Sequence, residues 1–256
     1  TALGLHSNAS DNFYLQDSNS KTCYIVDLKT LLNSRRFVPD EQFRYSSEVL
    51  PTSDLCLLDD NRYIGYHMWY LDDKQFSKVD SPIGYYQKGE DSGKGMDDFP
   101  FFVASVNGAR LFKNPQTQEL WTADMHRDAI RIYNDSLKQI RELVGPDHFS
   151  PEYTRRQIDA PVAFVTFADE CDYHAYTDYY ITDKHIYLVY EGNKHFDMKN
   201  LSPVEIFKLD FDGNLLCNYK LDRYVYSISI NKKEDTLYCA SRPSVMEPPV
   251  ILKYKL

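Results

Sequence analysis

The feature that most constrains the fold of this chain is a short motif that recurs along its whole length. Each copy is a polar turn followed by an apolar strand that carries an aromatic side chain. The copies are Asp11–Leu15, Asp60–Ile64, Gln118–Trp121, Asp183–Leu188 and Glu234–Cys239. Their aromatic residues, Tyr14, Tyr63, Trp121, Tyr187 and Tyr238, are separated by 49, 58, 66 and 51 residues. A repeat of this length is typical of folds that stack similar small sheets.

A second strand, ending in an acidic turn, follows the first four copies of the motif. These strands are Cys23–Asp27, Met68–Asp72, Ile130–Asp135 and Ile206–Asp210. Two of them continue into hairpins, one turning at Asp212–Asn214 and the other around Ser136, and the chain ends in the strand Val250–Leu256. We therefore predict an all-β fold, a β-propeller of four-stranded antiparallel blades that forms a single domain over residues 1–256. An irregular sandwich or barrel is the alternative.

Composition agrees with strands and excludes several classes of function. Of the 256 residues, 43% are apolar and 14% aromatic, and no stretch resembles a long amphipathic helix. The net charge of -9 leaves no broad basic surface, so nucleic acid is not expected as a partner. Apolar runs such as Ala163–Phe167 are far shorter than the roughly 20 residues that span a bilayer. Five dispersed cysteines without a CxxC pair argue against a disulfide framework and a zinc knuckle.

The C-terminal part of the chain resembles a known family. The stretches Phe207–Asn214, Tyr219–Asp222, Tyr226–Ile230, Thr236–Ala240 and Pro249–Tyr254 look like the final blades of TolB-like six-bladed propellers of Bacteroidetes. The resemblance implies an exported protein, periplasmic or anchored to the outer membrane as a lipoprotein, and most members of the family are uncharacterised. The sequence shows five blade-like copies where the family has six. The sixth is then incomplete, hidden within residues 76–112, or lost before Thr1.

An open propeller would leave unpaired strand edges and uncovered blade faces. Because the strand at Val250–Tyr254 is apolar and ends abruptly, we expect it to need a neighbour. We predict that Ala2–Leu15 lies beside the last blade and closes the ring.

The candidate site residues are those that blade loops could bring together at one mouth of the channel. In Asp124–Asp128, Asp124 and His126 follow the strand of Trp121. In Asp169–His174, an extended backbone would place Glu170, Asp172 and His174 on one face, where they could hold a divalent cation, although such a segment is also an ordinary acidic loop. Tyr173 opens a tyrosine-rich segment. The ligand-binding candidates are therefore Asp124, His126, Asp172, Tyr173 and His174.

No linear catalytic signature accompanies these residues. The segment Lys88–Gly95 lacks the spacing of a phosphate-binding loop, and the chain contains neither GxSxG nor HExxH. We therefore expect no cofactor and predict a non-catalytic binding propeller of the cell envelope that recognises a protein or a glycan at a channel mouth. The alternative is a hydrolase or lyase that acts on a carbohydrate or small molecule with a composite site from several blades.

Overall fold

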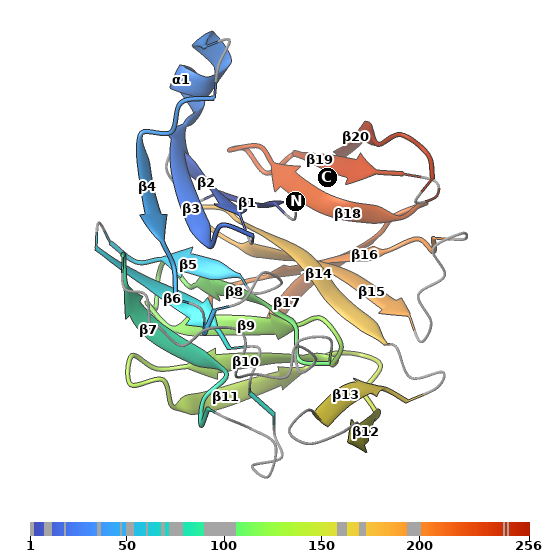
Figure 1. Cartoon of the computed structure of the whole chain (residues 1–256). Coiled ribbons are helices and arrows are strands. Elements are labelled where there is room, and N and C mark those ends of the chain that lie inside the picture. Colours follow the sequence, from blue (N-terminus) through green and yellow to red (C-terminus); the bar gives the residue numbers. More distant parts are fainter. Residues whose placement is uncertain are drawn as a thin grey trace. The chain divides into compact units, whose positions relative to one another are not determined.

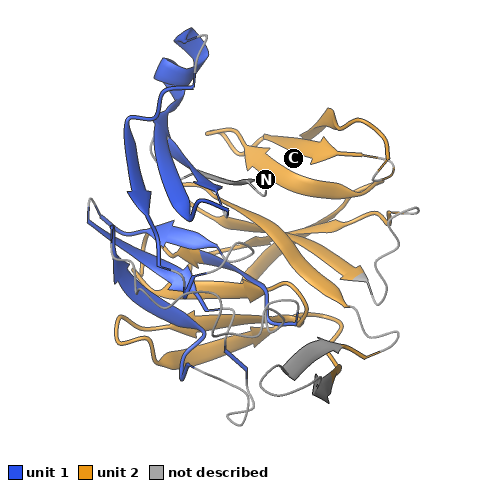
Figure 2. Cartoon of the chain, viewed as in Figure 1, with its two compact units in different colours: residues 1–111, 155–165 blue, residues 112–154, 166–256 orange. Residues whose placement is uncertain are grey.

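The computed structural model (Figure 1) describes most of the chain as antiparallel sheets with one short helix. The residues it describes are 3–7, 12–17, 19–34, 37–46, 48–49, 54–59, 61–67, 70–71, 79–89, 106–157, 163–168, 173–193, 201–242, 244 and 246–256. The chain divides into two compact units, coloured separately in Figure 2. Unit 1 comprises residues 1–111 and 155–165, and unit 2 comprises residues 112–154 and 166–256.

Unit 1 contains two antiparallel sheets and the helix. The first sheet has the strand order β1-β2-β3-β4, with β1 at Leu3–Ser7, β2 at Asn12–Asp17, β3 at Thr22–Asp27 and β4 at Glu41–Arg44. Helix α1, Leu28–Asn33, lies between β3 and β4. The second sheet has the order β5-β6-β7, with β5 at Leu55–Leu57, β6 at Arg62–Tyr66 and β7 at Ile83–Gln87. A buried cluster that includes Tyr14, Phe43 and Tyr63 lies between these two sheets.

Unit 2 is built from three antiparallel sheets. The first has the order β11-β10-β9-β8, with β8 at Ala109–Lys113, β9 at Leu120–Asp124, β10 at Ala129–Tyr133 and β11 at Gln139–Val144; the unit boundary falls within β8. The next, β14-β15-β16-β17, contains His174–Ile181, Ile186–Asn193, Glu205–Leu209 and Leu215–Lys220. The last, β18-β19-β20, contains Val225–Ile230, Thr236–Ser241 and Val250–Lys255.

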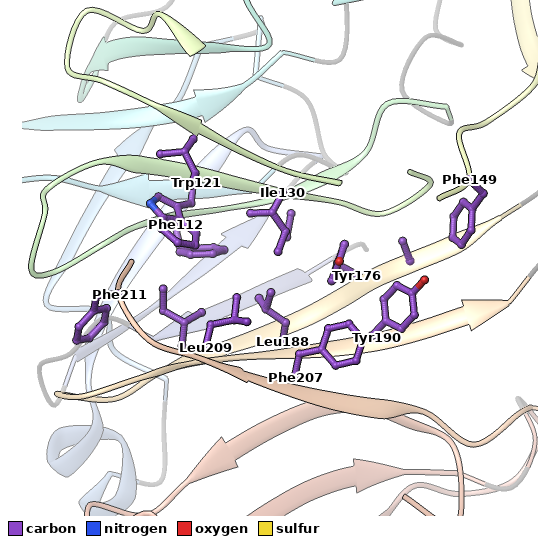
Figure 3. Packing of buried hydrophobic residues seen from close by; sticks show 14 residues of the cluster. Phe112, Trp121, Ile130, Phe149, Tyr176, Leu188, Tyr190, Phe207, Leu209 and Phe211 are labelled. Atoms are coloured by element: carbon purple, nitrogen blue, oxygen red, sulfur yellow. The ribbon is translucent and has the colours of Figure 1, made fainter. Parts of the chain in front are cut away.

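Successive sheets of unit 2 pack face to face, as propeller blades do. One apolar cluster joins the β8–β11 sheet to the β14–β17 sheet, and in Figure 3 its Trp121 and Ile130 point toward Leu188 and Leu209. A second cluster joins the β14–β17 sheet to the β18–β20 sheet through residues such as Val189 and Leu237. Strand β15 is therefore apolar on both faces and buried from Ile186 to Tyr190, because each face meets another sheet.

The recurring aromatic residues occupy equivalent places. Each one lies in the second strand of its sheet in chain order, namely β2, β6, β9, β15 and β19, which confirms the repeat prediction. Tyr14, Tyr63, Trp121 and Tyr187 are buried as expected. Tyr238 is 40% exposed, so the prediction that it is buried between sheets was wrong. Its neighbours Leu237 and Cys239 face the β14–β17 sheet, and the alternation of a strand turns Tyr238 to the opposite face.

The hairpin β12–β13 has no counterpart in the repeat. Its strands are Tyr153–Gln157 and Ala163–Phe167, and it forms a separate two-stranded sheet. It does not act as a blade between its neighbours in sequence, because the sheets β8–β11 and β14–β17 pack directly on each other. Among the described residues, the five sheets of three or four strands therefore correspond to the five copies of the motif. Those of residues 76–112 that the structure describes add strands only to these sheets.

Local predictions about turns are also confirmed. Gly213 adopts a φ of +86° in the hairpin between β16 and β17, and its N–H donates to the carbonyl of Asp210 at 3.1 Å. The Asp210 carboxylate accepts from the N–H groups of Asp212 and Asn214, so this side chain organises the turn. Cys23 and Cys239 are buried free thiols, as their strand positions suggest, whereas Cys217 is half-buried. The closure of a ring by Ala2–Leu15 stays a prediction.

Candidate functional site

Two strands, the turn between two others and the residue before a fifth strand bring polar side chains to one end of unit 2. His126 lies in the turn between β9 and β10, and His174 begins β14. Glu191 lies near the end of β15, and Tyr224 immediately precedes β18. We refer to His126, His174, Glu191 and Tyr224 as the three-sheet cluster, because they belong to three successive sheets.

The turn that carries His126 is docked onto the start of β14. The His126 ring nitrogen Nδ1 lies 2.8 Å from the carbonyl oxygen of Tyr173, and the N–H of Ala175 donates to the carbonyl of Met125 at 2.7 Å. A carbonyl only accepts, so Nδ1 of His126 carries the proton. The His126 ring also packs against Phe167, with ring centroids 4.7 Å apart. These contacts hold the imidazole of His126, which belongs to the β8–β11 sheet, against the start of β14 in the next sheet.

His174 links this turn to a buried carboxylate. Its ring meets that of His126 edge to face, with centroids 5.2 Å apart. Its Nδ1 atom lies 3.6 Å from Oε2 of Glu191, which is longer than a hydrogen bond but within reach of an ion pair. The side chain of His174 keeps 16% of its surface exposed, whereas that of Glu191 keeps only 1%. The imidazole is therefore the part of this pair that a ligand could reach.

Burial dominates the chemistry of Glu191. Neither of its carboxylate oxygens makes a hydrogen bond of standard geometry within the part of the chain that the structure describes. Removal from water raises the pKa of Glu191 to about 7, although the nearby hydroxyls of Tyr224 and Thr177 act in the opposite direction. This carboxyl therefore changes its charge close to neutral pH. Perturbed groups of this kind are concentrated at functional sites.

Tyr224 extends the cluster into the third sheet. Burial, followed by the negative charge of Glu191, raises the pKa of its phenol, so the hydroxyl stays protonated at neutral pH. Its carbonyl accepts a hydrogen bond from Ser241 at 2.6 Å, which fixes it to the end of β19. Arg242 follows Ser241 and lies over the ring of Tyr226, 4.9 Å from its centroid. The charge of Arg242 lowers the pKa of the Tyr224 phenol and Tyr226 raises it, so both residues lie near Tyr224 on this side.

The other sequence candidates take different positions. Asp124 is buried, and its carboxylate forms ion pairs with the guanidinium groups of Arg127 at 3.1 Å and Arg131 at 3.7 Å. Tyr173 is half-buried and stacks on Phe149 at 4.8 Å, while its carbonyl accepts from His126. Asp172 and Glu170 lie outside the described residues. Among the residues described, no group of three or more His, Cys, Asp and Glu is arranged to hold a metal ion.

The sequence analysis placed His126 and His174 in one candidate site but did not identify Glu191. One signal was present: Glu191 is the only charged residue in the run from Ile186 to Gly192, the rest of which is apolar apart from the tyrosine hydroxyls. An acid at the end of a strand buried on both faces costs free energy unless something compensates it. Its contact with His174 comes from the pairing of β14 with β15, in which His174 lies opposite Asn193, and the sequence does not reveal this register.

Comparisons with known proteins agree with this architecture. Among solved structures, a member of the DUF4221 family from Bacteroides vulgatus matches at 8% identity with a TM-score of 0.50, over 96% of this chain and 76% of the other. The extracellular domain of a putative hybrid two-component system from B. thetaiotaomicron matches at 10% identity with a TM-score of 0.41, over 92% of this chain. This chain spans only 26% of that second protein. A search of curated proteins finds no significant match.

A family model gives the assignment. The model described as TolB-like 6-blade propeller-like matches residues 104–233, which is half of the chain. The match includes the β14–β17 sheet and the turn that carries His126, and extends only partly into the C-terminal stretches on which the sequence resemblance rests. In the described part of the chain, no helix is long and apolar enough to cross a membrane. The chain belongs to the TolB-like 6-blade propeller-like family.

Proposed function

We propose that this chain is a non-catalytic binding module that holds a protein or a glycan at the end of unit 2 where the three-sheet cluster lies. The observation that carries the proposal is the meeting of His126, His174 and Glu191 from two sheets with Tyr224 from a third. A composite site of this kind leaves no linear motif, which fits a sequence without a catalytic signature.

The cluster offers a ligand hydrogen-bonding and aromatic groups. His126, His174, Tyr224 and Arg242 are all half-buried, and Tyr173 is half-buried beside them. Tyrosine combines a large contact area with a polar tip, and imidazole both donates and accepts hydrogen bonds. The acidic groups Asp124 and Glu191 are buried behind this surface. Asp172 stays part of the proposal as a further ligand contact.

A second candidate is the hydrolase or lyase, and one observation favours it. In the Glu191–His174 pair, a buried carboxyl with a pKa of about 7 lies behind a partly exposed imidazole. Such a carboxyl can stabilise an imidazolium, which is what a general base requires. Substrate turnover that disappears in both His174→Ala and Glu191→Gln would favour this candidate over pure binding.

The test of the binding proposal compares matched histidine variants. The wild-type chain is screened on a glycan array and against a periplasmic extract, and each captured ligand is measured again with His126→Ala and His174→Ala. His148→Asn is the control, because His148 is exposed and asparagine tolerates its positive φ. We expect at least a tenfold loss of affinity in the first two variants and less than a twofold change in the control. A ligand that binds all variants equally would contradict the proposed site.

We also propose that the protein is exported to the cell envelope and carries a lipid anchor. Only the family resemblance supports this location. Fractionation of the source cells, combined with labelling by radioactive palmitate, tests both parts. Recovery of the unlabelled protein in the cytosol would reject them.

A further inference from the structure

A group of exposed apolar side chains projects from the first sheet of unit 1. Leu28 is 42% exposed, Leu32 75%, Phe37 47% and Val38 54%. Leu28 and Leu32 belong to α1, none of whose residues is buried, and Phe37 and Val38 follow it before β4. Figure 1 shows α1 beyond the ends of β3 and β4. We call these four side chains the apolar tip.

Defined contacts hold the base of the apolar tip. Asp27 caps α1 by accepting from the N–H of Thr30 at 2.8 Å and from its hydroxyl at 3.0 Å. The N–H of Asp27 in turn donates to the carboxylate of Asp40 at 2.6 Å. Phe37 packs edge to face on Tyr24 of β3, with centroids 5.8 Å apart. The sequence therefore builds a specific support under side chains that it leaves exposed.

The charge of this segment is opposite to that of the chain. Residues 28–38 contain three basic residues and no acidic residue, in a protein with a net charge of -9. Lys29 is exposed within α1. The acids at the base, Asp27 and Asp40, are both engaged in holding the tip. Apolar side chains flanked by cations are typical of segments that lie in a membrane interface, with the apolar groups below anionic headgroups.

The size of the apolar tip favours a bilayer over a protein partner. A stable protein interface buries about 800 Å² on each side and involves roughly 20 residues, whereas this tip offers four projecting side chains. A bilayer needs no complementary shape, and a few inserted side chains with nearby cations give reversible attachment. We propose that the apolar tip docks unit 1 on the surface of a bilayer that contains anionic lipids.

Vesicle sedimentation with the full chain tests this proposal. The probes are vesicles of phosphatidylethanolamine with one third phosphatidylglycerol, and vesicles of phosphatidylcholine alone. We expect at least tenfold stronger binding to the anionic vesicles and a marked weakening in high salt, because the basic residues are screened. The triple variant Leu28→Ser, Leu32→Ser, Phe37→Ser should bind at least tenfold more weakly, and Lys29→Glu should give a smaller loss.

The matched control removes exposed apolar side chains elsewhere. Ile140→Ser combined with Leu215→Ser changes residues of similar exposure in unit 2 and should leave vesicle binding within twofold of the wild type. Equal binding by wild type and triple variant, or no binding by the wild type, would overturn the proposal. So would wild-type dimerisation that the triple variant loses in sedimentation without lipid. The ligand screen with His126 and His174 variants is independent, so failure of one proposal leaves the other standing.

Discussion

Among the described residues of unit 2, two glutamate–histidine pairs lie near opposite ends of strand β15, and they differ in hydrogen bonding and in charge state. Glu234, in the turn between β18 and β19, accepts from Nδ1 of His185 at 2.6 Å, from Lys208 at 3.3 Å and from the hydroxyls of Thr182 and Tyr187. Glu191 has only His174 at 3.6 Å as an ionic partner in the described structure. The Glu234 pair connects two adjacent sheets and is saturated with hydrogen bonds, whereas the Glu191 pair joins neighbouring strands of one sheet and is not.

The difference appears in the charge state of the two carboxyls. Burial alone would raise the pKa of Glu234, but the hydrogen bonds from Thr182, His185 and Lys208 lower it to about 2. Burial raises the pKa of Glu191 to about 7 because few groups compensate it. A carboxylate saturated with hydrogen bonds holds two sheets together. A carboxyl with few compensating groups, beside a partly exposed imidazole, can respond to a ligand or a proton.

The largest expected effect is on the saturated pair. Glu234→Ala removes the common acceptor of four donors and leaves Lys208 and His185 without their partner. We expect a loss of about 3 kcal/mol in the free energy of unfolding, measured by urea denaturation at pH 7. Glu234 also has a φ of +57°, so Glu234→Asn, which tolerates this region, serves as the backbone control. A loss below about 1 kcal/mol in Glu234→Ala would show that the network contributes little.

The under-compensated pair should respond in the opposite direction. At pH 8 the folded protein must keep an ionised Glu191 away from water, and a pKa displacement from 4.5 to about 7 corresponds to a cost of about 3 kcal/mol. Glu191→Gln removes that charge, so we expect the free energy of unfolding at pH 8 to be about 2 kcal/mol higher in the variant than in the wild type. At pH 4, where both states hold the proton, wild type and variant should be equally stable. A variant less stable than wild type at pH 8 would contradict this interpretation.

The two carboxyls should also give opposite slopes of stability against pH. Glu234 ionises at about pH 2 when folded and at about 4.5 when unfolded, so its contribution is complete above 4.5 and disappears as the pH falls toward 2. Glu191 ionises at about pH 7 when folded, so its presence lowers stability as the pH rises from 4.5 to 7. Urea titrations of wild type, Glu234→Ala and Glu191→Gln across pH 2–8 separate the two slopes. If the three proteins showed the same dependence of unfolding free energy on pH, the contrast between the two carboxyls would be contradicted.

A smaller effect is expected at His126. Its imidazole contributes one hydrogen bond to the Tyr173 carbonyl and a ring contact with Phe167, and its side chain is only partly buried. His126→Ala should therefore cost about 1 kcal/mol of stability, well below the loss in Glu234→Ala. Thermal unfolding at pH 7 measures it against His148→Asn. A loss of stability as large as that of Glu234→Ala would show that His126 mainly stabilises the fold rather than contacting a ligand.

The repeat could be predicted from the sequence because a polar turn and the strand after it are encoded by neighbouring residues. A polar turn before an aromatic strand appears five times, and all five aromatics fall in the second strand of their sheets. The exposure of Tyr238 was not predictable, because it depends on which face of the last sheet another element covers. The hairpin β12–β13 was not predicted because it departs from the repeat. Its strands carry no polar-turn and aromatic signature of the kind shared by the five copies.

The candidate site was only partly readable. His126 stood out as a polar residue in a turn and His174 as part of an acidic segment, and the structure brings their rings into contact. Glu191 did not stand out, because its significance comes from the depth of its burial between sheets and from its position near His174 on the paired strand. Such quantities depend on packing between segments far apart in the sequence. Asp124 was chosen for its type, and the structure places it in an ion-pair group with Arg127 and Arg131.

The contrast between the two glutamates is tested most directly by observing each carboxyl during a pH titration. Selective labelling of glutamate with ¹³C at Cδ, with resonances assigned from the spectra of Glu191→Gln and Glu234→Ala, gives both pKa values in the same folded protein. The account predicts that Glu191 titrates near pH 7 and that Glu234 remains ionised down to about pH 2. Titration of Glu191 near its ordinary value of about 4.5, or at a lower pH than Glu234, would contradict it.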